Sequence, residues 1–330
     1  MEVTIEQLVA TKTTATVDSG VPVAQMASNP NTDPQLLRQF AASKNWDLRR
    51  LVASNPNTPT DLLWELGIDF PEVILTNPIF ELLQLEHLDL ATEIPHATLT
   101  SLLQCDRVPR AFMDYAVNQQ DYSLWLAVAY NLQTPSALLK NLVRKSRRQD
   151  RELVRAVASH PNTSTHLLAE ISEISSSLAQ IVAKNPQTPL VVLQKILHKY
   201  GQTNSIFRIL MALHPCINPQ LLMQMNLAPN ESAAHSLWLA KQLTTDSTQL
   251  VELAQTNWDV LRLAVVCHPN TPTEQIDRLW LQIKSQIDRS TSNQATVEAV
   301  PEHRLIYDSF IGNANTSAQL REKLRKLLQW

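Results

Sequence analysis

Apolar residues recur along the chain in short helical runs that stop at a polar residue followed by proline. Residues 48–53, 153–158 and 178–183 read Leu-Arg-Arg-Leu-Val-Ala, Leu-Val-Arg-Ala-Val-Ala and Leu-Ala-Gln-Ile-Val-Ala, and each run ends two residues before Asn-Pro or His-Pro. A residue that precedes proline is pushed out of the α region. The polar residue, here called the anchor, is therefore predicted to end a short helix.

A second apolar pattern follows each anchor. Apolar residues stand eight and eleven positions after it, and a step of three residues places both on one face of a helix. These pairs are Leu37 and Phe40, Leu63 and Leu66, Leu139 and Leu142, Leu168 and Ile171, Leu193 and Ile196, Leu222 and Met225, Leu250 and Leu253, and Ile276 and Leu279. One repeat is thus predicted to be two short helices joined by a tight turn.

The anchors return at nearly constant intervals. Successive anchors are 22 to 29 residues apart, except for a last interval of 45 residues, and this period is typical of repeat architectures. About eleven repeats are predicted, with anchors at Asn29, Asn55, Asn77, Cys105, Asn131, His160, Asn185, His214, Gln242, His268 and Asn313. Residues 71–104 depart furthest from the pattern, so we expect an irregular layer there.

Four repeats carry Thr-Pro three residues after the anchor, at Thr58, Thr134, Thr188 and Thr271. This dipeptide is typical of a helix start, with the hydroxyl capping the first turn and proline at the first helical position. Each of these threonines is therefore expected to be the N-cap of the second helix of its repeat. Thr271 and Glu274 also have the spacing of a capping box.

At these residues the chain resembles the variant leucine-rich repeat family, whose signature runs close to Leu-Arg-x-x-Val-Ala-x-Asn-Pro-x-Thr-Pro-x-x-Leu-Leu and is matched most fully by residues 48–63. The resemblance implies an all-α, right-handed superhelical solenoid of alternating α and 3₁₀ helices, similar to armadillo and HEAT arrays. Some members of the family carry an iron–sulfur centre on an N-terminal cysteine cluster. The N-terminus has no cysteine, so we expect no cofactor.

A repeat array grows linearly and needs no domain break. We therefore expect a single domain over residues 1–330, with an N-terminal capping repeat at 1–27 and repeats at 28–280. A polar loop is expected at 281–300, which accounts for the long last interval, and a C-terminal capping repeat at 301–330.

Composition removes several functional classes. The chain has four scattered glycines, so no Gly-rich phosphate loop and no Gly-x-Ser-x-Gly elbow can be written. Its apolar runs are far shorter than a membrane span, and its first residues do not resemble a secretory or transit peptide. We expect a soluble, cytoplasmic protein without enzymatic activity.

Charge is unevenly distributed although the total is −3. Residues 51–106 contain no Lys or Arg and nine acidic residues, whereas residues 107–155 contain nine basic and four acidic residues. Solvated helix faces would account for both blocks, but so would a surface that steers a charged partner or stacks against a second copy of the chain. The candidate partner-binding residues are Asp61, Glu65, Asp69, Glu72, Glu81, Glu86, Asp89 and Glu93 in the acidic block, and Arg144, Lys145, Arg147, Arg148 and Arg151 in the basic one.

Histidines and cysteines do not predict a metal centre. His160, His214 and His268 recur at the anchor position, 54 residues apart. Layers of packed helices are about 8–10 Å apart, so rings two repeats apart cannot share one zinc ion. Each ring is instead expected to bond to its own turn, as the anchor asparagine does. Cys105, Cys216 and Cys267 stand at different positions of different repeats, so no cluster and no Cys-His pair is expected.

The expected function is a protein-interaction scaffold whose partner the sequence does not name. Nucleic acid is not the expected partner, because the basic run at 144–151 is short and lacks interleaved aromatic residues. The alternative, by analogy of fold alone, is a HEAT-like solenoid that binds nucleic acid, or a small ligand or pigment, on its concave face.

Overall fold

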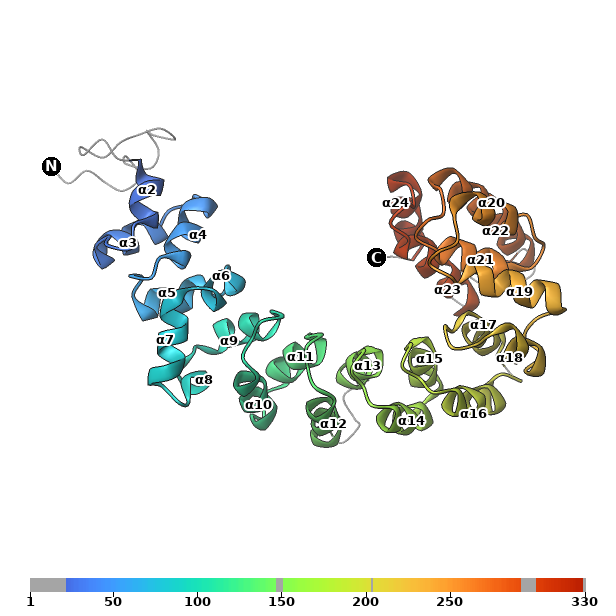
Figure 1. Cartoon of the computed structure of the whole chain (residues 1–330), viewed down its shortest axis with the longest axis horizontal. Coiled ribbons are helices and arrows are strands. Elements are labelled where there is room, and N and C mark those ends of the chain that lie inside the picture. Colours follow the sequence, from blue (N-terminus) through green and yellow to red (C-terminus); the bar gives the residue numbers. More distant parts are fainter. Residues whose placement is uncertain (1–21, 147–150, 203, 292–300, 329–330) are drawn as a thin grey trace. The chain divides into compact units, whose positions relative to one another are not determined.

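The computed structural model describes residues 22–146, 151–202, 204–291 and 301–328, and every regular element in these ranges is an α-helix (Figure 1). The all-α helical-repeat fold expected from the sequence is confirmed. The resemblance also implied 3₁₀ helices, but in the described residues both helices of each pair are α-helical. The right-handed sense of the superhelix stays a prediction.

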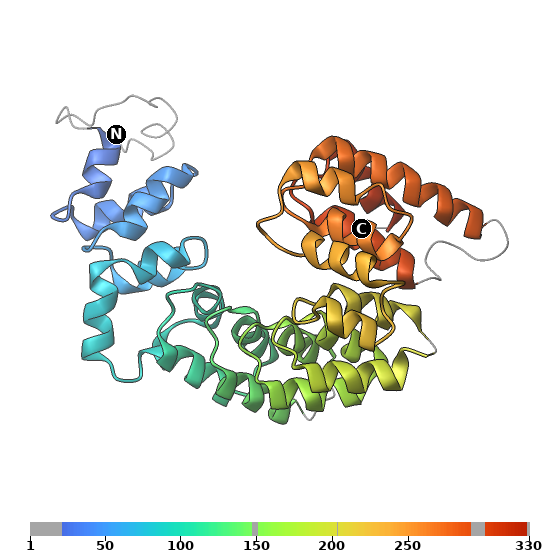
Figure 2. The same ribbon diagram turned by 45° about the vertical axis from the view of Figure 1, so that its right-hand side comes forward.

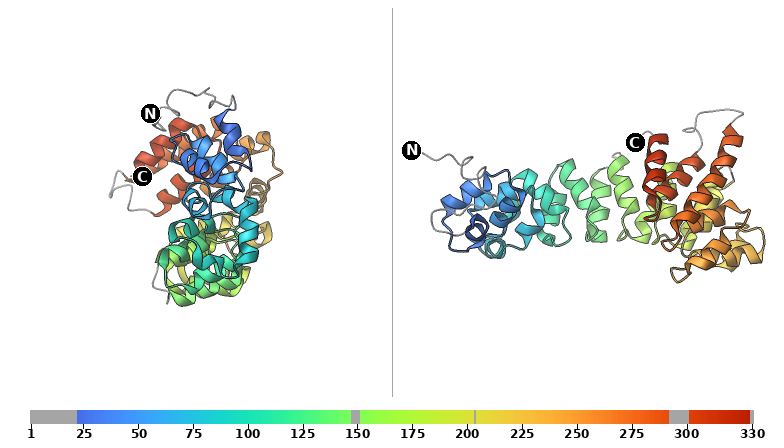
Figure 3. Two further views of the ribbon diagram at one scale, coloured as in Figure 1. Left: turned by 90° about the vertical axis from the view of Figure 1, so that its left-hand side faces the viewer. Right: turned by 90° about the horizontal axis from the view of Figure 1, so that it is seen from above.

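The chain forms two compact units, residues 1–163 and 164–330. In unit 1 the helices form two rows, and each repeat contributes one layer that crosses both rows. In the first row each helix contacts the next, and the second row lies beside it. The first row contains α2 (Val23–Ser28), α4 (Trp46–Ser54), α6 (Pro71–Leu75), α9 (His96–Leu103), α11 (Tyr122–Tyr130) and α13 (Arg151–Ser159), and the second row contains α3 (Pro34–Ala41), α5 (Thr60–Leu66), α7 (Pro78–Glu86), α8 (Leu90–Glu93), α10 (Arg110–Asn118) and α12 (Ser136–Lys145). Figure 3 shows the green helices α10 to α13 of this unit side by side.

Unit 2 also has two rows of helices. In its first row α15 contacts α17, α19 contacts α21, and α21 contacts α23, while α17 contacts both α21 and α23. The first row contains α15 (Ser176–Lys184), α17 (Ser205–Leu213), α19 (Glu231–Ala240), α21 (Asp259–Cys267) and α23 (Pro301–Gly312). The other contains α14 (Thr165–Ile174), α16 (Leu190–Tyr200), α18 (Pro219–Gln224), α20 (Ser247–Leu253), α22 (Thr273–Thr291) and α24 (Ala318–Leu327). One continuous domain across both units stays a prediction.

The core lies between the helices of each pair, where the apolar pattern placed it. Leu37, Leu63, Leu139, Leu168 and Leu193 are fully buried, as are most of their partners three residues later. Met225 and Leu253 are half-buried exceptions.

The anchors end helices as predicted. Asn55, Asn185 and His268 follow the last residue of a helix and have extended backbone, with ψ between 119° and 132°. Asn77 behaves differently, because α7 begins directly at Pro78 and uses the Asn77 side chain as its N-cap. The helices here are short or displaced, so the irregular layer expected at 71–104 is confirmed.

The helix-capping role expected for the threonines is wrong. The hydroxyls of Thr58, Thr134, Thr188 and Thr271 do not cap the next helix but donate to a carbonyl oxygen six residues back, in the last turn of the preceding helix, at 2.5–2.6 Å. The second helix starts one residue later than expected, and proline is the N-cap in the first three of these repeats. The threonine is therefore a buried clip on the end of the first helix. Thr32, Thr163, Thr245 and Thr316 make the same bond.

Anchor asparagines join each layer to the one before it. Asn55 Nδ2 donates to the carbonyl oxygens of Ala27 and Asn29, while its Oδ1 accepts the N–H of Asn57. Asn77, Asn131 and Asn313 make the same three contacts in their own layers. These amides form a buried ladder between layers, which satisfies the carbonyls left open at a helix end.

Two expected segments fall partly outside the described residues. Residues 1–21 of the expected N-terminal capping repeat are not described, and α2 begins at Val23. Residues 281–291 of the expected loop continue helix α22, which is the long orange helix of Figure 2, and residues 292–300 are not described.

Candidate functional site

The anchor histidines use both ring nitrogens. In His160, Nε2 donates to the carbonyl oxygen of Asn131 at 2.8 Å, and Nδ1 accepts the N–H of Asn162 at 3.0 Å. His214 and His268 make the corresponding bonds to the previous anchor and to their own turn. The expected bond to the turn is confirmed, and the bond to the preceding layer adds a second structural role. In this arrangement the ring is neutral, because Nδ1 must accept.

Lys241 replaces an anchor amide in the layer where the anchor is Gln242. Its Nζ lies 2.8 to 3.1 Å from the carbonyl oxygens of Ala212, His214 and Ile217. Two of these carbonyls are at the positions, relative to the previous anchor, that Asn55 bonds in its own layer. Burial lowers the pKa of Lys241 to about 8, so its ammonium form remains the main one at pH 7.

A Cys-His contact was not expected, and the structure corrects this. His214 Nδ1 lies 3.1 Å from Cys216 Sγ. Burial lowers the pKa of His214 and raises the pKa of the Cys216 thiol. A reactive pair needs thiolate beside imidazolium, whereas both groups here are held neutral. The contact packs the turn and does not activate the sulfur.

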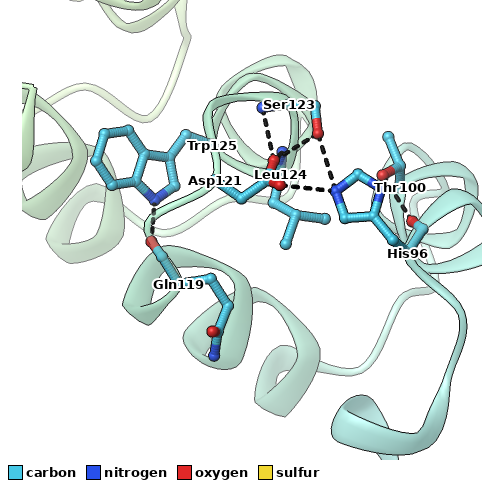
Figure 4. Close-up of polar contacts among 7 residues, drawn as sticks. All are labelled: His96, Thr100, Gln119, Asp121, Ser123, Leu124 and Trp125. Carbon is cyan, nitrogen blue, oxygen red and sulfur yellow. Dashed lines mark hydrogen bonds and ion pairs between the residues drawn. The ribbon is translucent and has the colours of Figure 1, made fainter.

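Ser123, His96 and Asp121 form a polar cluster on the surface of unit 1 (Figure 4). Its composition is that of a hydrolase triad, but its geometry is different. Asp121 Oδ2 and Ser123 Oγ both contact the same ring atom, His96 Nε2, at 2.9 and 3.1 Å. In a triad the serine and the carboxylate contact opposite nitrogens.

Asp121 is instead the N-cap of α11. Its Oδ1 accepts the N–H groups of Ser123 and Leu124 and the Ser123 hydroxyl. These hydrogen bonds, with the Ser123 hydroxyl foremost, lower the pKa of Asp121. The cluster therefore caps a helix and joins it to α9.

The acidic block contains paired and unpaired carboxylates. Asp61 on α5 forms a bidentate ion pair with Arg38, with both N–O distances at 2.8 Å, and this pair lowers the pKa of the Asp61 carboxyl. Asp69 forms an ion pair with Arg49 at 2.6 Å. Glu93 at the end of α8 contacts His87 at 2.9 Å. The remaining candidates, Glu65 on α5, Glu72 on α6, Glu81 and Glu86 on α7, and Asp89 before α8, are exposed and form no ion pair with a described residue.

A cavity of about 520 Å³ opens beside Glu72. Trp46 and Arg50 on α4, Phe70 before α6, and Cys105 after α9 are among its lining residues. A neighbouring cavity of about 260 Å³ shares Glu72 and Cys105 and adds Asp106. Burial, and then the negative charges of Glu72 and Asp106, raise the pKa of the Cys105 thiol to about 11. No local sequence pattern predicts this cavity, because its lining comes from three successive repeats.

Three of the basic candidates lie at the ends of α12 and α13. Arg144 and Lys145 end α12, and Arg151 begins α13. Lys145 Nζ donates to the carbonyl oxygen of Val117 and to Asn118 Oδ1, so it closes the end of α10. Arg147 and Arg148 lie outside the described residues.

In the described ranges, no three His, Cys, Asp or Glu side chains gather closely enough to hold a metal ion. Across those same residues, no helix combines the length and the apolar character needed to cross a bilayer.

Comparison with known proteins relates part of the chain to a known family. No curated protein and no solved structure matches the chain. Residues 22–67 match the family model described as Leucine Rich Repeat Variant domain. This segment contains helices α2 to α5, the anchors Asn29 and Asn55, and the ladder bonds between them. Residues 22–67 are thus similar to the Leucine Rich Repeat Variant domain, the family that the sequence resembles.

Proposed function

We propose that the chain is a non-enzymatic scaffold that binds a protein partner, and that the acidic block of unit 1 is part of the contact surface. The observation that carries this proposal is a set of exposed glutamates on α5, α6 and α7, namely Glu65, Glu72, Glu81 and Glu86, that form no ion pair with any residue the structure describes. A structural role accounts for Asp61 and Asp69, whose partners are arginines of preceding layers. It does not account for Glu72, Glu81 and Glu86.

Charge complementarity supports a basic partner segment. Residues 51–106 carry nine acidic residues without a Lys or Arg among them, and a field of one sign steers an oppositely charged partner and raises the association rate.

The first experiment is an affinity pull-down with the full chain, with and without nuclease, followed by identification of the retained proteins. A protein retained after nuclease supports the scaffold. Retention that disappears with nuclease would replace the proposal with nucleic-acid binding, centred on the basic run at 144–151.

The second experiment compares two variants of equal charge. Glu72→Gln, Glu81→Gln and Glu86→Gln neutralise the acidic block, whereas Glu231→Gln, Glu252→Gln and Glu274→Gln neutralise three exposed glutamates of unit 2. The first variant is expected to bind the captured partner roughly tenfold more slowly at low salt and with a weaker salt dependence, since exposed charges act mainly on the association rate. Equal rates for the two variants would remove the acidic block from the interface.

A further inference from the structure

Helix α7 buries one face against its neighbours. Phe80 and Leu83 are buried, and the Phe80 ring packs edge-on against Trp64 and Phe112, with centroids 6.3 and 5.9 Å apart. These contacts fix which side of α7 faces the core of unit 1.

The opposite side is apolar as well, and it faces solvent. Leu82 and Leu85 are 54 % and 80 % exposed, and Leu88, just beyond the helix, is 95 % exposed. At about 100° per residue, Leu82 and Leu85 lie on the side of α7 away from Phe80 and Leu83. We call these three residues the leucine stripe.

The leucine stripe differs from the other exposed leucines. A single exposed leucine is ordinary, but grouped ones mark an interaction surface. Leu132, Leu243 and Leu281 are between 60 and 75 % exposed, but they stand far apart in the sequence and on different elements. The grouping on α7 therefore needs an explanation that the fold does not supply.

Charge indicates what covers the leucine stripe. Glu81 and Glu86 flank it on α7, Asp89 follows Leu88, and none of the three forms an ion pair with a described residue. A second copy would bring these carboxylates together, and an anionic membrane would repel them. A helix with an apolar face and basic flanks would bury the leucines and neutralise the glutamates, which is the usual mode of helix recognition on an apolar surface.

We propose that the leucine stripe docks an amphipathic helix with basic flanks, supplied by the protein partner. This inference rests on the proposed scaffold function, because it names the part of the partner that unit 1 recognises.

The test uses the full chain and two synthetic peptides. One is a leucine–lysine peptide whose leucines line one side of a helix, and the other has the same composition with its leucines spread around the helix. Fluorescence anisotropy gives the Kd of each for the wild type, for Leu82→Ser/Leu85→Ser/Leu88→Ser, and for the control Leu132→Ser/Leu243→Ser/Leu281→Ser. Thermal melts of both variants check that they remain folded.

The amphipathic peptide is expected to bind the wild type and the control equally and the stripe variant at least tenfold more weakly. The permuted peptide is expected to bind all three weakly. Equal binding of both peptides to all three proteins would overturn the leucine stripe as a docking site but leave the acidic block as a charged surface. Binding of neither peptide to the wild type would overturn both, and a change of mass of the stripe variant in sedimentation would assign the surface to a second copy instead.

Discussion

At the scale of single residues, three different types of side chain donate hydrogen bonds from the anchor region to the backbone carbonyls of the preceding layer. An asparagine amide donates twice to the preceding layer, a histidine ring donates once, and the Lys241 ammonium donates to three carbonyl oxygens. Each supplies a donor to carbonyls that a helix end leaves open. The shared requirement is thus a donor of the right reach, and the identity of the residue is secondary.

The threonine clip gives the first prediction. Thr188→Val keeps the shape of the side chain but loses the hydroxyl that donates to Val182, so the free energy of unfolding is expected to fall by about 1 kcal/mol. Thr188→Ser keeps the hydroxyl and should retain most of that stability. Urea unfolding of the three proteins measures the difference, and a valine variant as stable as the wild type would contradict the clip.

His214 gives a prediction about pH. Burial holds its pKa in the folded state below the ordinary value of 6.5. Below pH 6.5 the unfolded chain therefore takes up a proton that the folded chain does not, and stability falls as pH decreases toward the folded pKa. Above pH 6.5 both states are neutral at this residue, and its contribution is fully present.

His214→Asn keeps an anchor side chain without a titrating group. Between pH 6.5 and 5, the free energy of unfolding of the wild type is expected to fall relative to that of the variant by at most about 1.4 kcal/mol per pH unit. Denaturant unfolding at several pH values measures it. Parallel curves for the two proteins would show that the ring does not resist protonation.

At the scale of helices, most boundaries and most of the core were open to prediction from the sequence. Asn-Pro dipeptides constrain the backbone locally, and a three-residue apolar step depends on helix geometry alone, so both can be read without tertiary structure. The threonine clip was missed because Thr-Pro fits a helix start equally well. The leucine stripe was missed because Leu82 and Leu85 have the same spacing as a buried pair.

The ion-pair partners of the acidic candidate residues could not be predicted from the sequence, for a different reason. Asp61 pairs with Arg38, 23 residues earlier, and Asp69 with Arg49, 20 residues earlier. Such pairs depend on how layers align, which no local pattern specifies. The acidic block was therefore visible as a block, but its division into paired and free carboxylates was not.

Gly67 gives a prediction at this scale, because it sets the approach of α5 and α9. Its φ is −64°, so its backbone does not require glycine, but a Cβ there would lie 2.6 Å from Thr98 Cγ2. Gly67→Ala is expected to lower the free energy of unfolding by roughly 1–3 kcal/mol through overpacking.

Thr98→Ser offers the matched rescue. It removes the clashing methyl group and keeps the hydroxyl that donates to the Trp64 carbonyl oxygen. Adding it to Gly67→Ala should restore part of the lost stability in thermal unfolding. A double variant no more stable than Gly67→Ala would place the strain against the helix backbone and not against Thr98.

At the scale of the whole molecule, stability in a repeat array is a sum of local terms and contacts between neighbours. Asn131→Ala removes two buried bonds to the layer of Leu103 and Cys105. We expect faster amide exchange in residues 96–145, where the free energy of local opening should fall by roughly 1–3 kcal/mol. Exchange in residues 259–285 should be unchanged.

Asn313→Ala serves as the reciprocal control, since it removes the corresponding bonds to Val266 and His268. It is expected to loosen residues 259–285 and leave residues 96–145 unchanged. Hydrogen exchange followed by mass spectrometry reports both regions in one experiment. Faster exchange throughout the chain in either variant would mean that the molecule opens as one cooperative body.

The buried ladder also determines how the protein would respond to mechanical tension. Within each unit, its amide, imidazole and ammonium donors point toward the layer nearer the N-terminus, so consecutive layers of a unit are joined by a few short bonds and by the apolar surface around them. A pulling force applied to the two ends of the chain would load these joints in series, and the joint that yields first would release the length of one repeat. Under tension, the molecule would lengthen in steps of about 22 to 29 residues, the interval between most anchors.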